Sequence, residues 1–234
     1  MMRLDKYLAE MGVGTRQEVK KQIRQGKVTV NGTVVKAADT KIDETCDEVT
    51  IGGRNISYVS YEYYMLNKPG GVVSATEDRR DTTVIDLIKD KKRKDLFPVG
   101  RLDKDTEGLL LITNDGELAH RLLSPKKHVD KVYYAKVQGK VDESDVKAFA
   151  DGVDIGDDTP AKSADLRILK SGEESEIELT ITEGRFHQVK RMFHAVGKEV
   201  IYLKRLSMGS LVLDKTLTKG EYRSLTEEEI KKLC

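Results

Sequence analysis

Residues 97–111 read Phe97-Pro98-Val99-Gly100-Arg101-Leu102-Asp103-Lys104-Asp105-Thr106-Glu107-Gly108-Leu109-Leu110-Leu111. The apolar run at the end of this stretch has the length and composition of a buried strand. Asp103 and Asp105 come just before it, where a loop would carry them. Paired carboxylates can hydrolyse glycosides, but two positions apart on a loop their side chains need not face one substrate. The residues alone therefore fit either a charged turn or a catalytic site.

Strand and helix patterns surround this stretch on both sides. Strands are predicted over residues 63–66, 72–74, 108–113, 131–138, 176–182 and 200–205. Helices are predicted over residues 83–89, 117–122, 143–149, 187–196 and 227–233. Strands far outnumber the alternations of strand, helix and strand. The predicted fold class is therefore α+β, with a mixed and mainly antiparallel sheet.

The first sixty residues read as a small separate unit. Apolar residues recur there at helical spacing, at Leu4, Tyr7, Leu8 and Met11. Thr15 and Glu18 have the spacing of a capping box at the start of a second helix. Asn31-Gly32 is a favoured hairpin turn, since a type I′ turn needs positive φ at both central residues. We place a domain boundary near residue 60, which predicts domains over 1–60 and 61–234.

Composition excludes several classes of protein. Of the 234 residues, 38% are hydrophobic and 35% charged, and the mean hydropathy is -0.50. No run approaches the roughly 20 apolar residues of a membrane helix, and the start of the chain lacks the apolar stretch of a secretory signal. The two cysteines, Cys46 and Cys234, exclude a disulfide scaffold and a cysteine zinc site. These features predict a cytoplasmic protein.

Charge is unevenly distributed along a chain whose net charge is only +1. Residues 1–30 carry seven basic and three acidic side chains, and residues 184–205 carry six basic and one acidic. Residues 142–183 carry four basic and thirteen acidic ones. Such segregation allows a basic face on a nearly neutral protein, and this face could bind nucleic acid.

The second predicted helix is a candidate for such a face. Arg16, Lys20 and Arg24 recur every four residues and share one side of it, where they could hold phosphates without reading bases. An ordinary solvated helix would look the same by charge alone. The segments Arg3-Leu4-Asp5-Lys6-Tyr7-Leu8, Thr15-Arg16-Gln17-Glu18-Val19 and Val28-Thr29-Val30-Asn31-Gly32, however, resemble the S4-type RNA-binding domain over residues 2–55. This resemblance implies RNA contacts by Arg3, Arg16, Lys20, Lys21 and Arg24.

A second basic cluster reads Glu183-Gly184-Arg185-Phe186-His187-Gln188-Val189-Lys190-Arg191-Met192-Phe193. It predicts a strand end, a glycine turn and the start of a basic helix, which suits an anion. His187 and His194 are seven residues apart, and without a third nearby ligand they make a poor metal site. We therefore predict no metal. Lys68-Pro69-Gly70-Gly71 lacks the spacing of a nucleotide-binding loop.

These segments, taken in order, resemble the pseudouridine synthases. The matching blocks are Tyr64-Met65-Leu66-Asn67-Lys68-Pro69-Gly70-Gly71, then Gly100-Arg101-Leu102-Asp103 with Thr106 and Gly108, then Lys131-Val132-Tyr133, then residues 183–192. Gly220-Glu221-Tyr222-Arg223 and residues 225–230 extend the likeness to nearly the whole chain. The RsuA-type branch matches best, because it too carries an S4-type domain in front. The resemblance implies a synthase domain with a central cleft.

The resemblance also implies a reaction and a set of site residues. Pseudouridine formation breaks the N1–C1′ bond of uridine and joins C5 to C1′, so no redox or group-transfer cofactor is needed. Asp103 corresponds to the family's essential carboxylate, which acts covalently on the sugar or assists formation of a glycal-like intermediate. A nearby cation would keep it ionised, and Lys190 occupies the family position, with Arg191 as its rival.

The resemblance implies supporting roles for several other positions. Tyr133 corresponds to the active-site tyrosine; Tyr134 follows it directly, but adjacent strand residues point to opposite faces. Arg101 corresponds to the arginine that holds the extruded nucleotide. Leu203 matches an apolar residue near the base, although a plain core leucine would read the same. Secondary candidates for RNA backbone contacts are Lys68, Arg185 and His187.

The sequence thus predicts a cytoplasmic, monomeric enzyme that isomerises uridine in 16S ribosomal RNA of the small subunit. Its partner would be that RNA or an assembly intermediate containing it, with no membrane and no small-molecule cofactor. Two alternatives stay open. One is a related synthase that acts on 23S ribosomal RNA, and the other is a ribosome-assembly protein that binds RNA without catalysis.

Overall fold

The computed structural model describes residues 1–124 and 127–233, which fold into two compact units. The first comprises residues 1–62 and 89–96. The second comprises residues 63–88 and 97 onward. The chain leaves the first unit just after the expected boundary near residue 60, but it returns to that unit for eight residues.

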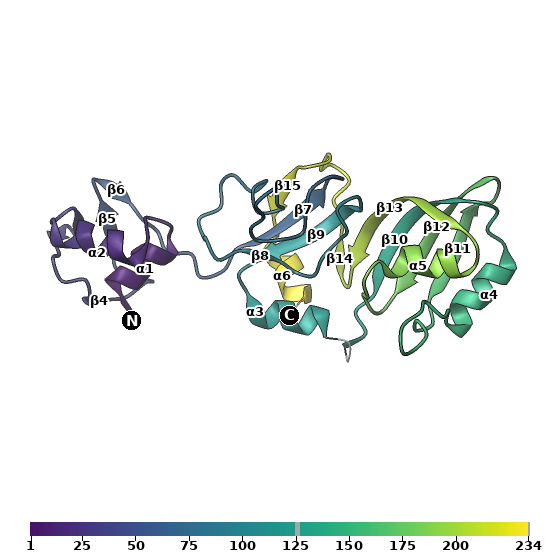
Figure 1. Cartoon of the computed structure of the whole chain (residues 1–234). Helices are drawn as coiled ribbons and strands as arrows, with labels where there is room; N and C mark the ends of the chain where they lie inside the picture. Colours follow the sequence, from purple (N-terminus) through teal and green to yellow (C-terminus); the bar gives the residue numbers. More distant parts are fainter. Residues whose placement is uncertain (125–126, 234) are drawn as a thin grey trace. The chain divides into compact units, whose positions relative to one another are not determined.

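The N-terminal unit packs two helices against short strands (Figure 1). Its helices are α1 (Leu4–Glu10) and α2 (Arg16–Arg24), and its strands are β1 (Met2–Arg3), β2 (Val28–Val30), β3 (Thr33–Val34), β4 (Lys41–Ile42), β5 (Val49–Ile51) and β6 (Arg54–Asn55). The predicted capping box is confirmed, because the Thr15 hydroxyl accepts from the Glu18 amide while the Glu18 carboxylate accepts from the Thr15 amide. The predicted hairpin is also confirmed, with positive φ at Asn31 and Gly32.

The returning segment 89–96 is tied to the N-terminal unit by Arg93. Its buried guanidinium binds Asp95 through two nitrogens and Glu10 through the third, at 3.1 Å. The Glu62 carboxylate accepts from the backbone amides of Lys92 and Arg93. The lysine-rich segment 89–96 is therefore part of a folded unit.

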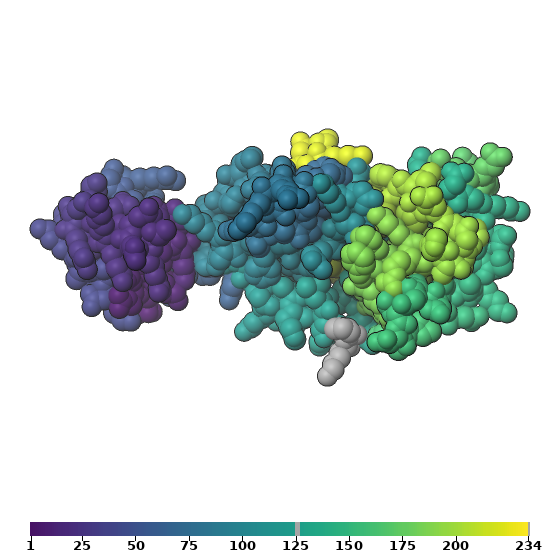
Figure 2. All heavy atoms as spheres, in the orientation of Figure 1, coloured from purple at the N-terminus to yellow at the C-terminus, as the bar shows by residue number. Residues whose placement is uncertain are grey.

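The larger unit is built on one mixed sheet in the order β11-β12-β10-β13-β9-β7-β15. Its strands are β7 (Tyr63–Lys68), β8 (Phe97–Pro98), β9 (Glu107–Thr113), β10 (Lys131–Gln138), β11 (Asp165–Lys170), β12 (Glu174–Ile181), β13 (Glu199–Met208), β14 (Leu211–Val212) and β15 (Tyr222–Ser224). All named pairs are antiparallel except β13 with β9. The predicted α+β class is thereby confirmed. In Figure 2 the yellow C-terminal segment packs on the blue strand region, as the β15–β7 pairing requires.

Gly108 makes the parallel pairing possible. A Cβ atom at this position would lie 2.3 Å from the carbonyl oxygen of Arg205 on β13, and φ is +97°. Any side chain would force the two strands apart. The glycine therefore lets β13 approach β9 closely at the point where the loop containing Asp103 enters β9.

Helices lie beside both halves of the sheet (Figure 1). They are α3 (Gly116–Leu123), α4 (Glu143–Asp151), α5 (Gln188–Ala195) and α6 (Glu227–Leu233). The helix predicted over 83–89 is wrong, since this segment forms only turns. Thr83 and Asp86 bond reciprocally like a capping box, but no helix continues from them.

No helix among the described residues is long and apolar enough to cross a membrane. Cys46 is a free, exposed cysteine, and Cys234 lies outside the described residues.

Candidate active site

A small cavity of about 60 Å³ opens in the larger unit beside the parallel seam of the sheet. Three kinds of segment line it: the loop before β9, the strands β10 and β13, and the turn between β12 and α5. The lining residues are Arg101, Leu102, Asp103, Thr106, Tyr133, Ile181, Gly184, Arg185, His187, Gln188, Val189 and Leu203. The cavity thus gathers segments that are up to a hundred residues apart in the sequence.

Asp103 is the carboxylate of this cavity, and its side chain is 25% exposed. Lys190 Nζ on α5 lies 3.5 Å from Asp103 Oδ2. The same ammonium donates to both oxygens of Asp105, at 2.6 and 2.7 Å. Lys190 is therefore placed between two carboxylates and lies closer to Asp105 than to its expected partner.

Asp105 remains ionised beside this lysine. Desolvation raises the pKa of its carboxyl, but the hydrogen bond and charge of Lys190 outweigh that effect and lower the pKa below its ordinary value. The two negative charges and the one positive charge form a compact cluster at the edge of the cavity.

His187 supplies a second nitrogen near Asp103. Its Nε2 lies 3.7 Å from Asp103 Oδ1, on the opposite carboxylate oxygen from Lys190. The residue precedes α5 and has a left-handed backbone, with φ of 47°. His187 therefore lies at the cavity rim beside a carboxylate, and its predicted contact with the RNA backbone stays a prediction.

Tyr133 and Tyr134 point to opposite faces of β10, as the alternation of a strand requires. Tyr133 is buried and lines the cavity. The Tyr134 hydroxyl donates to Glu176 at 2.7 Å, and this bond is the main cause that raises the pKa of Tyr134 to about 12. Of the two tyrosines, only Tyr133 is in reach of a base in the cavity.

Apolar side chains complete the cavity wall. Leu203 faces Ala135 across the β10–β13 ladder and lines the cavity together with Ile181 and Val189. An apolar floor beside a buried tyrosine suits a planar base. Arg101 stands at the rim and is exposed, and no side chain in the described parts of the chain forms an ion pair with it.

The predicted contact of Lys68 with the RNA backbone is wrong. Its side chain is fully buried, and Nζ donates to the carbonyl oxygens of Pro69, Asp103, Lys104 and Thr106 at 2.8–3.2 Å. Burial lowers its pKa to about 8. A side chain with no exposed surface cannot meet an RNA phosphate, so Lys68 instead holds the loop that carries Asp103.

Sequence reasoning missed a second support of this loop. The Ser74 hydroxyl donates to the Leu102 carbonyl at 2.8 Å and accepts from the Leu102 amide at 3.1 Å. Ser74 is 28 residues before Leu102, and a serine at the end of the strand predicted over 72–74 carries no distinguishing signal. That predicted strand is wrong, since Val73 makes only an isolated bridge to Thr83. Ser74 and Lys68 together fix the backbone on both sides of Asp103.

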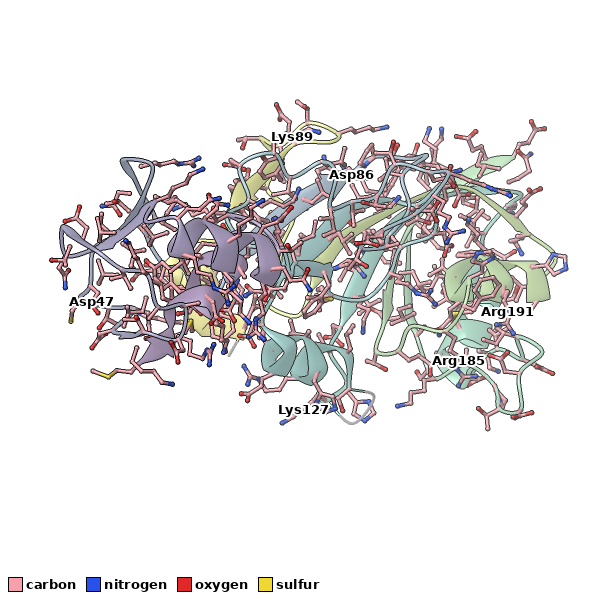
Figure 3. All side chains as sticks on the ribbon, turned by 60° about the vertical axis from the view of Figure 1, so that its left-hand side comes forward. Asp47, Asp86, Lys89, Lys127, Arg185 and Arg191 are labelled. Carbon is pink, nitrogen blue, oxygen red and sulfur yellow. The ribbon has the colours of Figure 1, made fainter. Side chains whose placement is uncertain are left out.

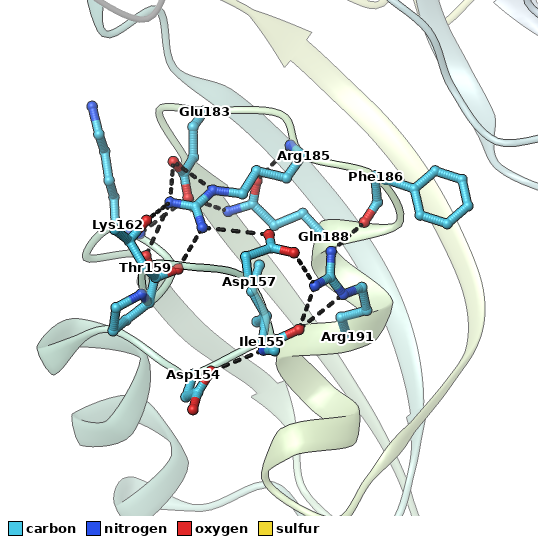
Figure 4. A network of polar contacts seen from close by, with 12 residues as sticks. Asp154, Ile155, Asp157, Thr159, Lys162, Glu183, Arg185, Phe186, Gln188 and Arg191 are labelled. Atoms are coloured by element: carbon cyan, nitrogen blue, oxygen red, sulfur yellow. Dashed lines mark hydrogen bonds and ion pairs between the residues drawn. The ribbon is translucent and has the colours of Figure 1, made fainter.

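Arg185 and Arg191 belong to a polar network beside the cavity (Figures 3 and 4). Arg185 donates to the carbonyl oxygens of Thr159 and Pro160, at 2.6 and 3.0 Å. Arg191 binds Asp157 and the Ile155 carbonyl. Arg191 is thus engaged away from Asp103, whereas its rival Lys190 lies beside it.

The N-terminal unit carries the other predicted RNA contacts. A shallow hollow on α2 is lined by Gln17, Lys20, Lys21, Arg24 and Gln25. Arg16 is exposed on the same helix, but it lines a different hollow of this unit, next to Lys94. Arg3 binds Asp5 through two nitrogens, at 2.8 and 3.0 Å. The predicted basic helix face is therefore present, with Arg16 at its margin.

Metal ligands do not gather in the described residues. No group of three or more histidine, cysteine, aspartate or glutamate side chains is arranged there to hold an ion.

Comparison with protein families gives two matches. Residues 62–195 match the RNA pseudouridylate synthase family, and residues 2–49 match the S4 domain. A solved structure titled "Crystal structure of pseudouridylate synthase" is 41% identical, with a TM-score of 0.70 and full coverage of both chains.

Curated relatives are similar over almost their whole length. "Uncharacterized RNA pseudouridine synthase YtzG" of Bacillus subtilis is 51% identical, covering 98% of this chain and 97% of the relative. "Ribosomal small subunit pseudouridine synthase A" of Haemophilus influenzae is 42% identical over 99% of both chains. "Ribosomal large subunit pseudouridine synthase B" of Bacillus subtilis is 41% identical over 100% of this chain and 96% of the relative. The chain therefore belongs to the RNA pseudouridylate synthase family, as an isomerase with an RNA-binding S4 domain in front of its synthase domain.

Proposed function

We propose that the protein converts uridine to pseudouridine in 16S ribosomal RNA of the small subunit, with Asp103 as the essential carboxylate. The observation that carries this proposal is the position of Asp103 in a cavity walled by Tyr133 and Leu203, with Lys190 3.5 Å away. A non-catalytic RNA-binding protein would have no need for a half-buried carboxylate beside a cation in a pocket of this size.

Asp103 acts on the sugar of the target nucleotide. The reaction breaks the bond from C1′ to N1 and forms a bond from C1′ to C5; N1 gains a proton and C5 loses one, so the atoms balance without another reactant. An ionised carboxylate can attack C1′ or assist formation of a glycal-like intermediate. Lys190 places a positive charge 3.5 Å from the Asp103 carboxylate.

The target nucleotide must leave its helix to reach this carboxylate. Extrusion of the base from its helix costs a few kcal/mol. Arg101 at the rim has an exposed guanidinium that can hold a phosphate of the extruded nucleotide. Tyr133 then meets the uracil, which rests on the apolar floor that includes Leu203.

The identity of the RNA rests on the relatives. The Haemophilus relative, which aligns over 99% of both chains, is named for the small subunit, and this supports 16S RNA. The Bacillus relative named for the large subunit supports 23S RNA as the second candidate. The proposed substrate would place the enzyme in the cytoplasm, where we propose that it acts as a monomer.

Mapping of modified uridines decides between the two RNAs. We expect cells that lack this protein to lose pseudouridine at a site in 16S RNA and to regain it when the wild-type gene is restored. The measurement is pseudouridine sequencing of all ribosomal RNA. Loss of a 23S site instead would establish the second candidate, and an unchanged map in both RNAs would contradict synthase activity on ribosomal RNA.

The N-terminal unit is proposed to dock RNA through α2. Replacing Arg16, Lys20 and Arg24 together by glutamine should weaken RNA binding and reduce the salt slope of the binding constant by about 2–3, since each lost phosphate contact removes about 0.7–0.9. Filter binding across a salt series measures both quantities.

A matched variant controls for net charge in this experiment. Lys140, Lys147 and Lys170 are exposed in the larger unit, and their joint replacement by glutamine removes the same charge from another surface. This control should keep the wild-type salt slope. Equal slopes for the wild type and the α2 variant would remove α2 from the docking surface.

A further inference from the structure

Phe186 differs from the other phenylalanines of the chain. Phe149 and Phe193 are fully buried and pack on each other, with ring centroids 4.9 Å apart, and Phe97 packs against the core. Phe186 is 72% exposed. A large apolar side chain gains nothing from this exposure in the isolated protein, because apolar surface is stabilised by removal from water.

The backbone that carries Phe186 is firmly held (Figure 4). Arg191 Nη1 donates to the Phe186 carbonyl at 3.1 Å, and the Gln188 side-chain carbonyl accepts from the Arg185 amide at 2.9 Å. Gln188 in turn donates to Glu183 at 2.8 Å. Figure 4 shows the Phe186 ring pointing away from this network. The ring is therefore presented to solvent on a fixed turn, so little order would need to be gained on binding.

Phe186 is linked to Asp103 through the ring of His187. Its ring stacks on His187, with centroids 3.8 Å apart and planes 18° from parallel. His187 Nε2 lies 3.7 Å from Asp103 Oδ1. His187 has a left-handed backbone, with φ of 47°, a conformation that histidine adopts more often than most residues with a side chain.

The surroundings of the two rings indicate a nucleic acid. His187 lines both the catalytic cavity and a neighbouring hollow along α5, whose lining includes Lys190, Arg191, His194 and Lys198. Lys190, Arg191 and Lys198 are ion-paired with Asp105, Asp157 and Asp145, so their charges are partly neutralised within the protein. Single-stranded RNA is bound by base stacking on aromatic rings beside a basic groove, and the exposed Phe186 ring supplies such a stacking face.

We propose that Phe186, stacked on His187, is a platform that binds a nucleobase of the substrate RNA next to the extruded uridine. The inference rests on the proposed function and adds a base-binding site outside the cavity. Neighbouring bases are spaced by about 3.4 Å along a strand, and a single ring layer separates the Phe186 ring from the cavity. Extrusion of the uridine leaves the neighbouring base without a stacking partner. This base can then stack on the Phe186 ring.

A tryptophan reporter tests this contact directly. The chain contains no tryptophan, so Phe186→Trp introduces a single fluorophore that can stack in the same way. The variant is made together with Asp103→Asn to prevent turnover and is titrated with 16S and 23S RNA transcripts. We expect quenching on binding of the substrate transcript. The matched control is Leu169→Trp in the same background, on the 44% exposed side chain of edge strand β11, and it should remain unquenched.

Kinetics test the contribution of the ring. A base stacked on an aromatic side chain typically contributes enough that Phe186→Ala should raise KM for RNA by about 5- to 100-fold, with kcat changed less than about twofold. Phe186→Tyr and Phe186→Trp should restore KM, whereas Phe186→Leu should not, because it keeps apolar volume and removes the ring face.

Three results would overturn the platform: an unquenched tryptophan at saturating RNA, an unchanged KM for Phe186→Ala, or full rescue by leucine. An unchanged map of pseudouridine in the ribosomal RNA of cells that lack the protein would instead refute the proposed function. The fluorescence titration does not depend on turnover, so it still decides whether the platform exists.

Discussion

Asp103→Asn should abolish pseudouridine formation while leaving RNA affinity within about twofold of the wild type. The substitution keeps the shape of the side chain and removes the charge that acts on the sugar. Loss of a group that forms or assists a covalent step commonly costs about 10⁴-fold or more in rate. Single-turnover conversion of a ribosomal RNA transcript measures this loss, and filter binding measures affinity.

The control for this experiment is Asp165→Asn. Asp165 is an exposed carboxylate on β11 of the same unit, and its replacement should leave the rate unchanged. Equal melting temperatures for both variants and the wild type would exclude unfolding as the cause. Wild-type turnover by Asp103→Asn would remove the carboxylate from the chemistry and leave RNA binding as the only function of the cavity.

Affinity is expected to survive because Asp103→Asn removes none of the cations or rings that are proposed to bind RNA. Lys190 keeps its two contacts to Asp105 when Asp103 is neutral, at 2.6 and 2.7 Å, so it is not released to bind or repel the substrate differently. The α2 face of the N-terminal unit is untouched. A strong loss of binding by Asp103→Asn would therefore contradict this division between docking and chemistry.

The sequence correctly predicts the elements that depend on residues close together in the chain. The Thr15–Glu18 capping box, the Asn31-Gly32 hairpin and the apolar run of β9 each depend on residues within a few positions, and all three are present. The same reasoning failed for 83–89. Thr83 and Asp86 have the bonds of a helix start and Val84, Ile85 and Ile88 are buried, but the segment makes only turns. A first turn fixes many dihedral angles for few hydrogen bonds, so a helix forms only where further turns follow.

Long-range contacts could not be predicted from local pattern. Lys190 and Asp105 are 85 residues apart, and the position of Lys190 beside Asp103 followed only from resemblance. Arg93 is buried in ion pairs with Asp95 and Glu10, although arginine is mostly exposed in folded proteins. Phe186 is 72% exposed, although phenylalanine is among the residues most often buried. Charge and hydrophobicity indicate an average environment, and functional sites depart from that average.

Lys68→Met should both destabilise the larger unit and lower the rate of pseudouridine formation. The ammonium of Lys68 donates to four backbone carbonyls, three of which belong to the loop that carries Asp103. Methionine fills similar space without a donor and leaves buried carbonyls unpaired, at about 1–3 kcal/mol each. We expect a loss of at least about 3 kcal/mol in the free energy of unfolding, measured by urea denaturation.

The rate should fall by about 100-fold even where the variant is fully folded, since a displacement of about 1 Å at a catalytic group has that effect. Lys136→Met is the matched control. Lys136 is a strand lysine on β10 with 41% side-chain exposure and a surface ion pair to Glu174, which contributes little. Wild-type stability and rate in Lys68→Met would show that the four hydrogen bonds do not hold the loop.

The pH dependence separates this role from ordinary packing. Burial lowers the pKa of Lys68 to about 8 from 10.5, so between these values the unfolded chain binds more protons than the folded one. Wild-type stability therefore gains from Lys68 as pH rises through this window. Lys68→Met has no such group, and the stability difference between the two proteins should widen from pH 8 to 10.5. A difference that is constant with pH would mean that burial does not lower the pKa of Lys68.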